Sequence, residues 1–169
     1  MTKKRLACSA AGAAAIAATL TGVALATPGN AVVGTIMARA GFTNPVSIMF
    51  RLADDHSNRT QVIQVRNAKD TVIQQITFTA GGHTGWHSHP GPALVLVTQG
   101  ELTLYSADDS ACSGRTYSAG QAFIDPGQGH VHIGRASQTG NTVVWVTYFD
   151  VPPGSGVRID APDPGTCVF

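Results

Sequence analysis

The chain has 169 residues, which suits a single domain, and 43% of them are hydrophobic, enough to form a substantial core. Charged residues make up only 12%, below the roughly one quarter that is usual in globular domains. The formal net charge is +1. Nothing in this balance would attract nucleic acid, so we expect no nucleic-acid partner.

The first 26 residues have the organisation of a secretory signal peptide. A basic start, Lys3-Lys4-Arg5, is followed by an apolar run to about position 23, and Ala24-Leu25-Ala26 places small residues at a cleavage site. We therefore predict cleavage after Ala26 and a secreted protein with no membrane attachment. A membrane anchor is the alternative, because the run is about long enough to span. Cleavage would remove three of the 11 Lys and Arg residues, leaving eight against 10 acidic residues, a net charge of −2.

Three cysteines occur, and the predicted cleavage would remove Cys8. Cys112 and Cys167 would remain, and a pair of cysteines in an exported chain can form one disulfide. This bond would tie the C-terminal tail to a loop. The alternative is two unrelated buried thiols, and the absence of a CxxC spacing disfavours a metal role for them.

Short runs rich in β-branched residues, separated by glycine and polar turns, predict strands throughout the remaining chain. Outside the signal peptide no segment has a helical apolar stripe, so we expect a sandwich or barrel. We divide the chain into a signal peptide (1–26), an N-terminal arm with one strand near 32–37 (27–44), a barrel (45–152) and an irregular tail (153–169). The predicted barrel strands are 46–52, 60–65, 71–79 (ended by Gly81-Gly82), 86–89, 93–98, 101–106, 115–117, 122–124, 131–133 and 142–149.

Four of the six histidines form two pairs, His87 with His89 and His130 with His132. Residues two apart on a strand project to the same side, so each pair would present both rings to one face. If the two strands were neighbours, four imidazoles would meet near one point. Imidazole is a common ligand of transition metals. The pattern therefore predicts a metal site.

The region around the first pair resembles the first cupin motif, which is glycine, five residues, HxH, three or four residues, glutamate, six residues and glycine. Five residues separate Gly81 from His87, and Gly100 matches the closing glycine. Gly120 and Pro126 fit the second, looser motif. The resemblance covers about residues 71–150. It implies an all-β fold, the cupin-type double-stranded β-helix or jelly-roll barrel.

The chain departs from the family pattern at two positions. Ala93 stands where the motif has glutamate, so the usual site of three histidines and one glutamate would lack its carboxylate. In the second motif the histidine position falls on Val131, and one extra residue in the preceding turn would move it to His132. We therefore expect His87, His89 and His132 as metal ligands, with His130 as the alternative third ligand or as a fourth. A site that has lost its metal is the other possibility.

Several other residues have weaker signals. His83 is expected at the rim of the site and His56 on the surface. Asp125 is expected to be exposed, or alternatively to support a metal ligand. Trp86 is expected in the core, and one of Trp145 and Tyr148 is expected to face the pocket.

The expected cofactor is one divalent transition metal, with Zn, Cu, Mn, Fe and Ni all open. Two functions remain open as well. The first is a small secreted metalloenzyme of oxygenase, isomerase or hydrolase type that acts on a small polar molecule. The second is a non-enzymatic module that binds a small ligand or the metal. A homodimer through the apolar strand at 32–37 is a further expectation. His87→Ala should abolish metal binding, whereas His56→Ala should not.

Overall fold

The computed structural model describes residues 26–54 and 59–169. The predicted signal peptide lies outside this part except for Ala26, and so does the turn that contains His56. All regular secondary structure in the described ranges is β-strand. Within these ranges there is accordingly no helix long and apolar enough to cross a membrane.

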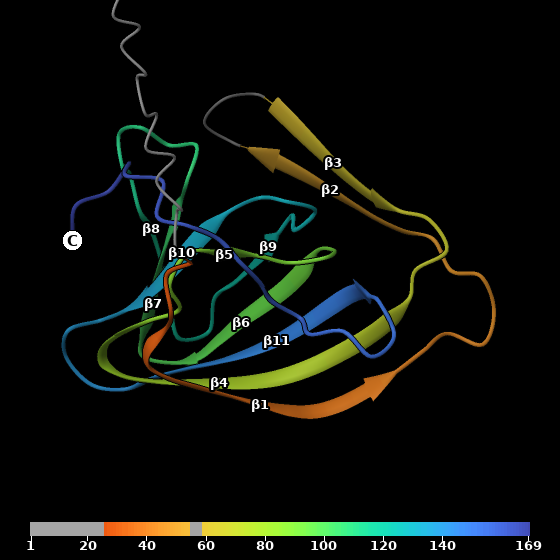
Figure 1. The fold of residues 1–169 in the computed structure, drawn as a ribbon, viewed down its shortest axis with the longest axis horizontal. Helices are drawn as coiled ribbons and strands as arrows, with labels where there is room; N and C mark the ends of the chain where they lie inside the picture. The colour runs from red at the N-terminus through yellow and green to blue at the C-terminus, as the bar shows by residue number, and fades with distance from the viewer. Residues whose placement is uncertain (1–25, 55–58) are drawn as a thin grey trace, which may run out of the picture.

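Ten strands form one antiparallel sheet that curls into a barrel (Figure 1), which confirms the predicted all-β, cupin-type fold. The central order is β12-β5-β10-β4-β11-β6-β9, with β1 added along β4 and the β7–β8 pair added at β10. The strands are β1 (Asn30–Ala40), β4 (Asp70–His83), β5 (His87–Ser88), β6 (Ala93–Gln99), β7 (Glu101–Ser106), β8 (Arg115–Ser118), β9 (Ala122–Asp125), β10 (His132–Ala136), β11 (Thr142–Val151) and β12 (Ile159–Asp160).

The core fills the inside of this barrel with alternate residues of its long strands. On β11, Val144, Val146 and Tyr148 are buried, while the residues between them are partly exposed. Val144 lies opposite Val97 of β6, which is also buried. Burying a side chain of this size stabilises the fold by about 1.5–3 kcal/mol. The period-two pattern in the sequence therefore fixes which face of each strand points inward.

Strand β4 continues through Gly81-Gly82, where the sequence had predicted its end, and runs to His83. Gly81 has a φ of +73°, a value that favours glycine, and its N–H donates to the carbonyl of Ser137. The glycines thus bend the strand without ending it. Beyond the bend His83 pairs with Arg135 of β10, so one long strand reaches two sides of the barrel.

Two predicted segments differ from the division made above, and the strand near 32–37 takes the alternative to a dimer contact, pairing within its own barrel. The range 27–44, predicted as an arm, contains β1, whose 11 residues pair along β4 as an edge of the main sheet. Within the range 45–152, predicted as barrel, β2 (Ile48–Asp54) and β3 (Arg59–Val65) form a separate two-stranded sheet. Phe50 of this hairpin packs against Phe149, with ring centroids 5.6 Å apart. Both differences concern pairing between strands, which depends on distant residues.

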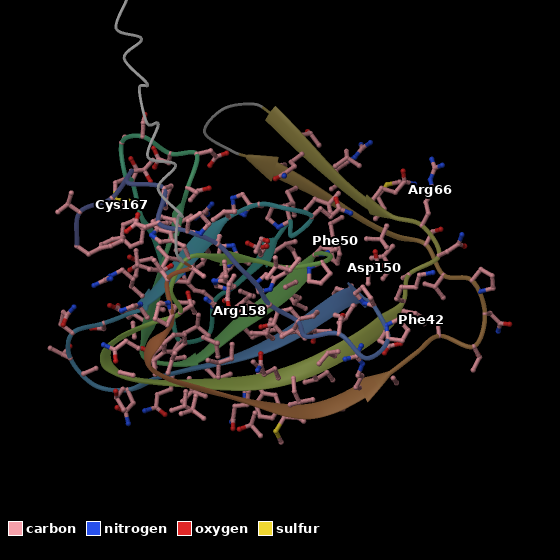
Figure 2. All side chains as sticks on the ribbon, viewed as in Figure 1. Phe42, Phe50, Arg66, Asp150, Arg158 and Cys167 are labelled. Atoms are coloured by element: carbon pink, nitrogen blue, oxygen red, sulfur yellow. A yellow bond between two sulfur atoms is a disulfide. The ribbon has the colours of Figure 1, made fainter. Side chains whose placement is uncertain are left out.

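The C-terminal tail is joined to the barrel by a disulfide between Cys112 and Cys167, with an S–S distance of 2.06 Å. Cys167 and Arg66 lie toward opposite ends of the molecule, as Figure 2 shows. At the Cys167 end a second, smaller core forms around Trp86, which is 2% exposed and packs with Ile133 and Ala161. Trp86 thus takes the core position expected for it.

Candidate metal centre

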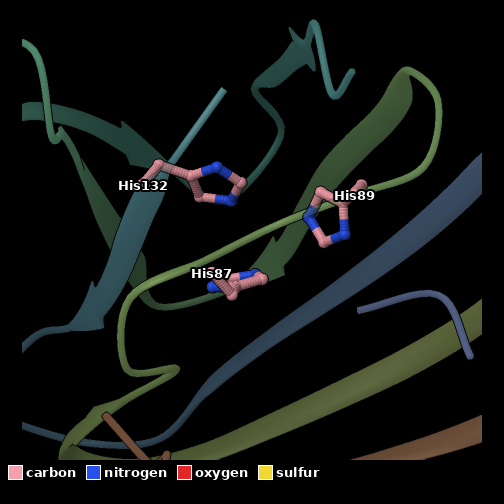
Figure 3. Close-up of side chains that lie close together, drawn as sticks. All are labelled: His87, His89 and His132. Atoms are coloured by element: carbon pink, nitrogen blue, oxygen red, sulfur yellow. The ribbon is translucent and has the colours of Figure 1, made fainter. Parts of the chain in front are cut away.

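His87, His89 and His132 lie together at one end of the barrel (Figure 3). His87 begins β5, His89 follows that strand, and His132 begins β10, where it pairs directly with His87. The ring centroids are 4.4 Å apart for His87 and His132, 4.8 Å for His87 and His89, and 5.1 Å for His89 and His132. One potential ligand atom of each residue lies within 4.8 Å of the others, a spacing that could hold a metal ion.

These three side chains are buried, and for His87 and His89 the burial determines the charge. Burial lowers the pKa of His87 to about 2, with the neighbouring imidazoles as the next cause. Burial likewise lowers the pKa of His89 to about 4, followed by the effect of His132. Both rings are therefore neutral at neutral pH, and a neutral imidazole keeps one nitrogen lone pair free to bind a metal.

Each of the three rings directs its Nδ1 at an oxygen that accepts a hydrogen bond. A carbonyl or carboxylate oxygen has no proton to give, so Nδ1 carries the proton and the lone pair is on Nε2. The acceptors are the carbonyl of Gly85 for His87 (2.9 Å), the carbonyl of Val157 for His89 (2.7 Å) and the carbonyl of His130 for His132 (3.4 Å). The Asp125 carboxylate lies 3.0 Å from the same nitrogen of His132. The surrounding chain thus selects the same tautomer for all three.

Asp125 is only 1% exposed, so the expectation of an exposed side chain was wrong and the alternative of a supporting role agrees with the structure. Its carboxylate contacts Nδ1 of both His132 and His130 and accepts the N–H of Gly127 at 2.7 Å. Burial alone raises the pKa of Asp125, but the hydrogen bonds from the two histidines outweigh it and hold the pKa well below its usual range. Asp125 lies directly across from Ala93, the position of the missing glutamate. The carboxylate therefore comes from the neighbouring strand, and it contacts a histidine of the trio.

His130 lies outside the trio, although its ring stacks on that of His132 with centroids 5.6 Å apart, and with Asp125 and His132 it forms a second group that could hold a metal ion. It precedes β10, in a turn, so the alternation of strand side chains does not apply to it. Its Nδ1 lies 3.2 Å from Asp125 and its Nε2 lies 2.8 Å from the hydroxyl of Ser106. The Asp125 hydrogen bond raises the pKa of His130. A ring with both nitrogens engaged and a preference for the charged form is a poor metal ligand.

His83 is also separate from the trio. It ends β4 and accepts the N–H of Gly85 on its Nδ1 at 3.2 Å. Burial, followed by the positive charge of Arg135, lowers its pKa. The residue therefore lies beside the segment that leads to His87, as expected for a rim position.

Two cavities adjoin the three histidines. The inner one is small, about 40 Å³, and lies among the apolar side chains of the barrel, with all three histidines and Asp125 in its wall. The outer one has a volume of about 310 Å³ and shares His87, His89 and Tyr148 with the inner one, but His132 is not part of its wall. Of the two aromatic residues proposed from the sequence, Tyr148 is therefore the one that faces the site.

The outer cavity also contains residues that the sequence analysis missed. Gln74 lies in its wall and accepts the Tyr148 hydroxyl proton at 3.0 Å. Arg158 and Val157 come from the tail that was predicted to be irregular. The predicted disulfide to Cys112 was the only sequence signal that the tail lies near the barrel. It did not indicate which residues of the tail would reach the site.

No family model matches the sequence, and no curated protein matches it. Among solved structures, the polyketide cyclase RemF from Streptomyces resistomycificus is 18% identical over 56% of this chain and 64% of its own, with a TM-score of 0.45. An oxalate oxidase is 24% identical over 53% of this chain and 45% of its own, with a TM-score of 0.43. An RmlC-like cupin from Shewanella frigidimarina is 19% identical over 49% and 68%, with a TM-score of 0.40. The chain thus spans less than two thirds of the first two proteins. The fold and site above rest on this chain's own geometry, because all three TM-scores are below 0.5.

Proposed function

We propose that this chain, a cupin superfamily member by its motifs and its barrel, binds one divalent transition metal ion through His87, His89 and His132. The observation that carries the proposal is the shared tautomer, since every Nδ1 of the trio is held by an acceptor and every Nε2 is left for a ligand bond. Three imidazoles suit Zn, Cu, Ni and Fe better than Mg or Ca, and Mn stays open through the family resemblance.

Three protein ligands leave coordination positions open, which is the arrangement of catalytic metal sites. The open side would face the outer cavity of about 310 Å³, because His87 and His89 form part of its wall. A metal bound there would polarise a substrate oxygen or lower the pKa of bound water. We therefore propose a small metalloenzyme of oxygenase, isomerase or hydrolase type, acting on a small polar molecule.

A non-enzymatic ligand-binding or metal-binding module is the second candidate. One observation favours it: among the described residues, the wall of the outer cavity contains no Asp or Glu that could act as a general base. Steady turnover of any small polar substrate by the loaded protein would exclude this candidate. Binding of such a molecule without chemical change would support it.

Metal content after loading tests the metal proposal. Purified protein is incubated separately with Zn, Cu, Mn and Fe(II), excess ion is removed, and bound metal is counted by mass spectrometry. We expect about one ion per chain for at least one metal, with occupancy lost in His132→Ala and retained in His130→Ala. The second variant is the matched control, because His130 is a histidine two residues away and outside the trio. Equal occupancy in both variants would exclude the assigned ligands.

We also propose that the chain is exported and cleaved after Ala26. One observation supports export. The disulfide between Cys112 and Cys167 suits an oxidising compartment. Mass spectrometry of exported protein should give a chain that begins at Thr27, and a chain that still begins at Met1 would contradict cleavage.

A further inference from the structure

Arg158 is the one formally charged side chain in the wall of the outer cavity, counted over the residues that the structure describes. Gln74 and Tyr148 provide polar but uncharged groups, and Val32, Ile76 and Val157 provide apolar surface. The cavity therefore has a net positive charge before any metal is bound.

The guanidinium of Arg158 is held in place by one ion pair and two long backbone contacts. Its Nε is paired with the carboxylate of Asp160, whose side chain is 58% exposed, and its Nη2 has long contacts of 3.4 Å to the carbonyls of Thr27 and Trp86. In the described part of the chain, Nη1 has no hydrogen-bond partner. A fixed guanidinium with a vacant N–H group is a typical receptor for an oxygen anion.

The amide of Gln74 adds a second donor to the cavity. Its oxygen accepts the proton of the Tyr148 hydroxyl at 3.0 Å, which leaves the NH₂ group to donate. Gly34 of β1 makes room for this group, because a Cβ there would lie 2.4 Å from Nε2 of Gln74. The uncommitted groups of the wall are thus donors, which favour a ligand that carries acceptor oxygens.

We propose that the outer cavity binds a small organic carboxylate, with its carboxylate group on Arg158 and its remainder directed toward the three histidines. This inference deepens the proposed function, on which it rests for the metal at the other end of the ligand. A volume of about 310 Å³ is at the lower end of small-molecule pockets, so the ligand is small. Arg158 is then the specificity-determining residue, supplied by the tail and positioned by Asp160 and two backbone carbonyls.

Calorimetric titration with succinate and with succinamide tests the proposal, because the second compound has a similar shape and no charge. For zinc-loaded wild-type protein we expect binding of succinate and little or no binding of succinamide. Arg158→Gln should weaken succinate binding by about 10- to 100-fold, the usual effect of losing a hydrogen bond to a charged group. Arg158→Lys should restore part of it, because it returns the charge without the planar fork.

Arg66→Gln is the matched control, since Arg66 is exposed and belongs to the chain beyond β3, away from the cavity (Figure 2). It removes the same charge and should bind succinate like the wild type. Thermal unfolding of every variant checks that it is folded. If Arg158→Gln does not fold, Arg158→Lys still tests the proposal. Equal affinity for succinate and succinamide, or equal weakening by Arg66→Gln and Arg158→Gln, would overturn the proposal.

Two further measurements separate this inference from the metal proposal. Zinc content should be unchanged in Arg158→Gln, because the variant leaves all three histidines in place. In metal-free protein succinate should bind more weakly but still depend on Arg158. Selective, Arg158-dependent binding without any metal uptake would contradict the metal proposal alone. Metal uptake with no preference for the anion would contradict the carboxylate proposal alone.

Discussion

The two nitrogens of His132 lie in different environments. Nδ1 is 3.0 Å from the buried carboxylate of Asp125, and the ring lies next to His87 with centroids 4.4 Å apart. A carboxylate behind a metal-binding histidine fixes the ring and makes its free nitrogen a stronger donor to the metal. Asp125 would thus act on the metal through His132 without touching it.

Asp125→Asn should lower metal affinity by about 10- to 100-fold, the usual effect of removing such a support. The amide has nearly the same size, but it removes the negative charge that both histidines face. Competition with a chelator of known affinity measures the change. Asp163→Asn is the control, because Asp163 is exposed and only accepts the N–H of Gly165 in a local turn. Wild-type affinity in Asp125→Asn would show that the carboxylate has no such role.

For individual residues, the sequence predicted that the three histidines would lie together but not which residues surround them. The HxH spacing and the shift in the second motif led to His87, His89 and His132, and Ala93 marked the missing glutamate. The burial of Asp125 could not be predicted, because it depends on the pairing of β9 with β6. The alternation of strand side chains does not apply to His130, because β10 begins two residues later, and its ring still stacks on that of His132.

The C-terminal segment, residues 157–169, holds the first histidine pair in position. The carbonyl of Val157 accepts the Nδ1 proton of His89, and β12 pairs with β5, placing Asp160 opposite His87. The disulfide at Cys167 ties this segment to the loop between β7 and β8. A segment of irregular chain therefore orients two proposed ligands and also provides Arg158.

Replacing both Cys112 and Cys167 with serine should lower the free energy of unfolding by about 2–4 kcal/mol, because the open chain gains entropy when it unfolds. The metal affinity should fall as well, since the C-terminal segment that contains Val157 would be less firmly held. Urea denaturation and chelator competition measure the two effects. The wild-type protein in reducing agent should behave like the double variant. Full metal affinity in the double variant would show that the disulfide does not support the site.

The disulfide was predictable from the number of cysteines, whereas the contacts of the tail were not. β12 contains only two residues, too few for any alternation to be visible, and its pairing with β5 spans about 70 positions of the chain. Strand β1 shows the same limit, since its apolar residues predicted a strand but not its pairing along β4. Local sequence thus indicates strands, while their order in the sheet depends on contacts between distant residues.

Buried, neutral histidines affect the stability of the whole molecule. The pKa of His87 is about 2 and that of His89 about 4 in the folded chain, against 6.5 for an unperturbed histidine. Between about pH 6.5 and pH 4 the unfolded chain therefore binds more protons than the folded chain. The stability due to these two rings is fully present above pH 6.5 and is lost as the pH falls.

The free energy of unfolding of the metal-free protein should therefore decrease from pH 7 to pH 5, with a slope of up to about 1.4 kcal/mol per pH unit for each histidine. Urea denaturation at pH 7, 6 and 5 measures this slope. His87→Asn removes one of the two groups and should give a shallower slope. The raised pKa of His130 acts in the opposite direction, so the comparison between the two proteins is decisive. An equal slope in the wild type and in His87→Asn would contradict the burial of a neutral ring at this position.

X-ray absorption spectroscopy of the zinc-loaded protein tests directly whether three imidazoles form a metal centre. We expect three imidazole nitrogens at about 2.0–2.1 Å from the zinc, with any remaining ligand a light atom from solvent. The imidazole signal should fall to two rings or disappear in His132→Ala and stay at three in His130→Ala. A spectrum of the wild-type protein with sulfur ligands, or with fewer than three imidazoles, would contradict the account.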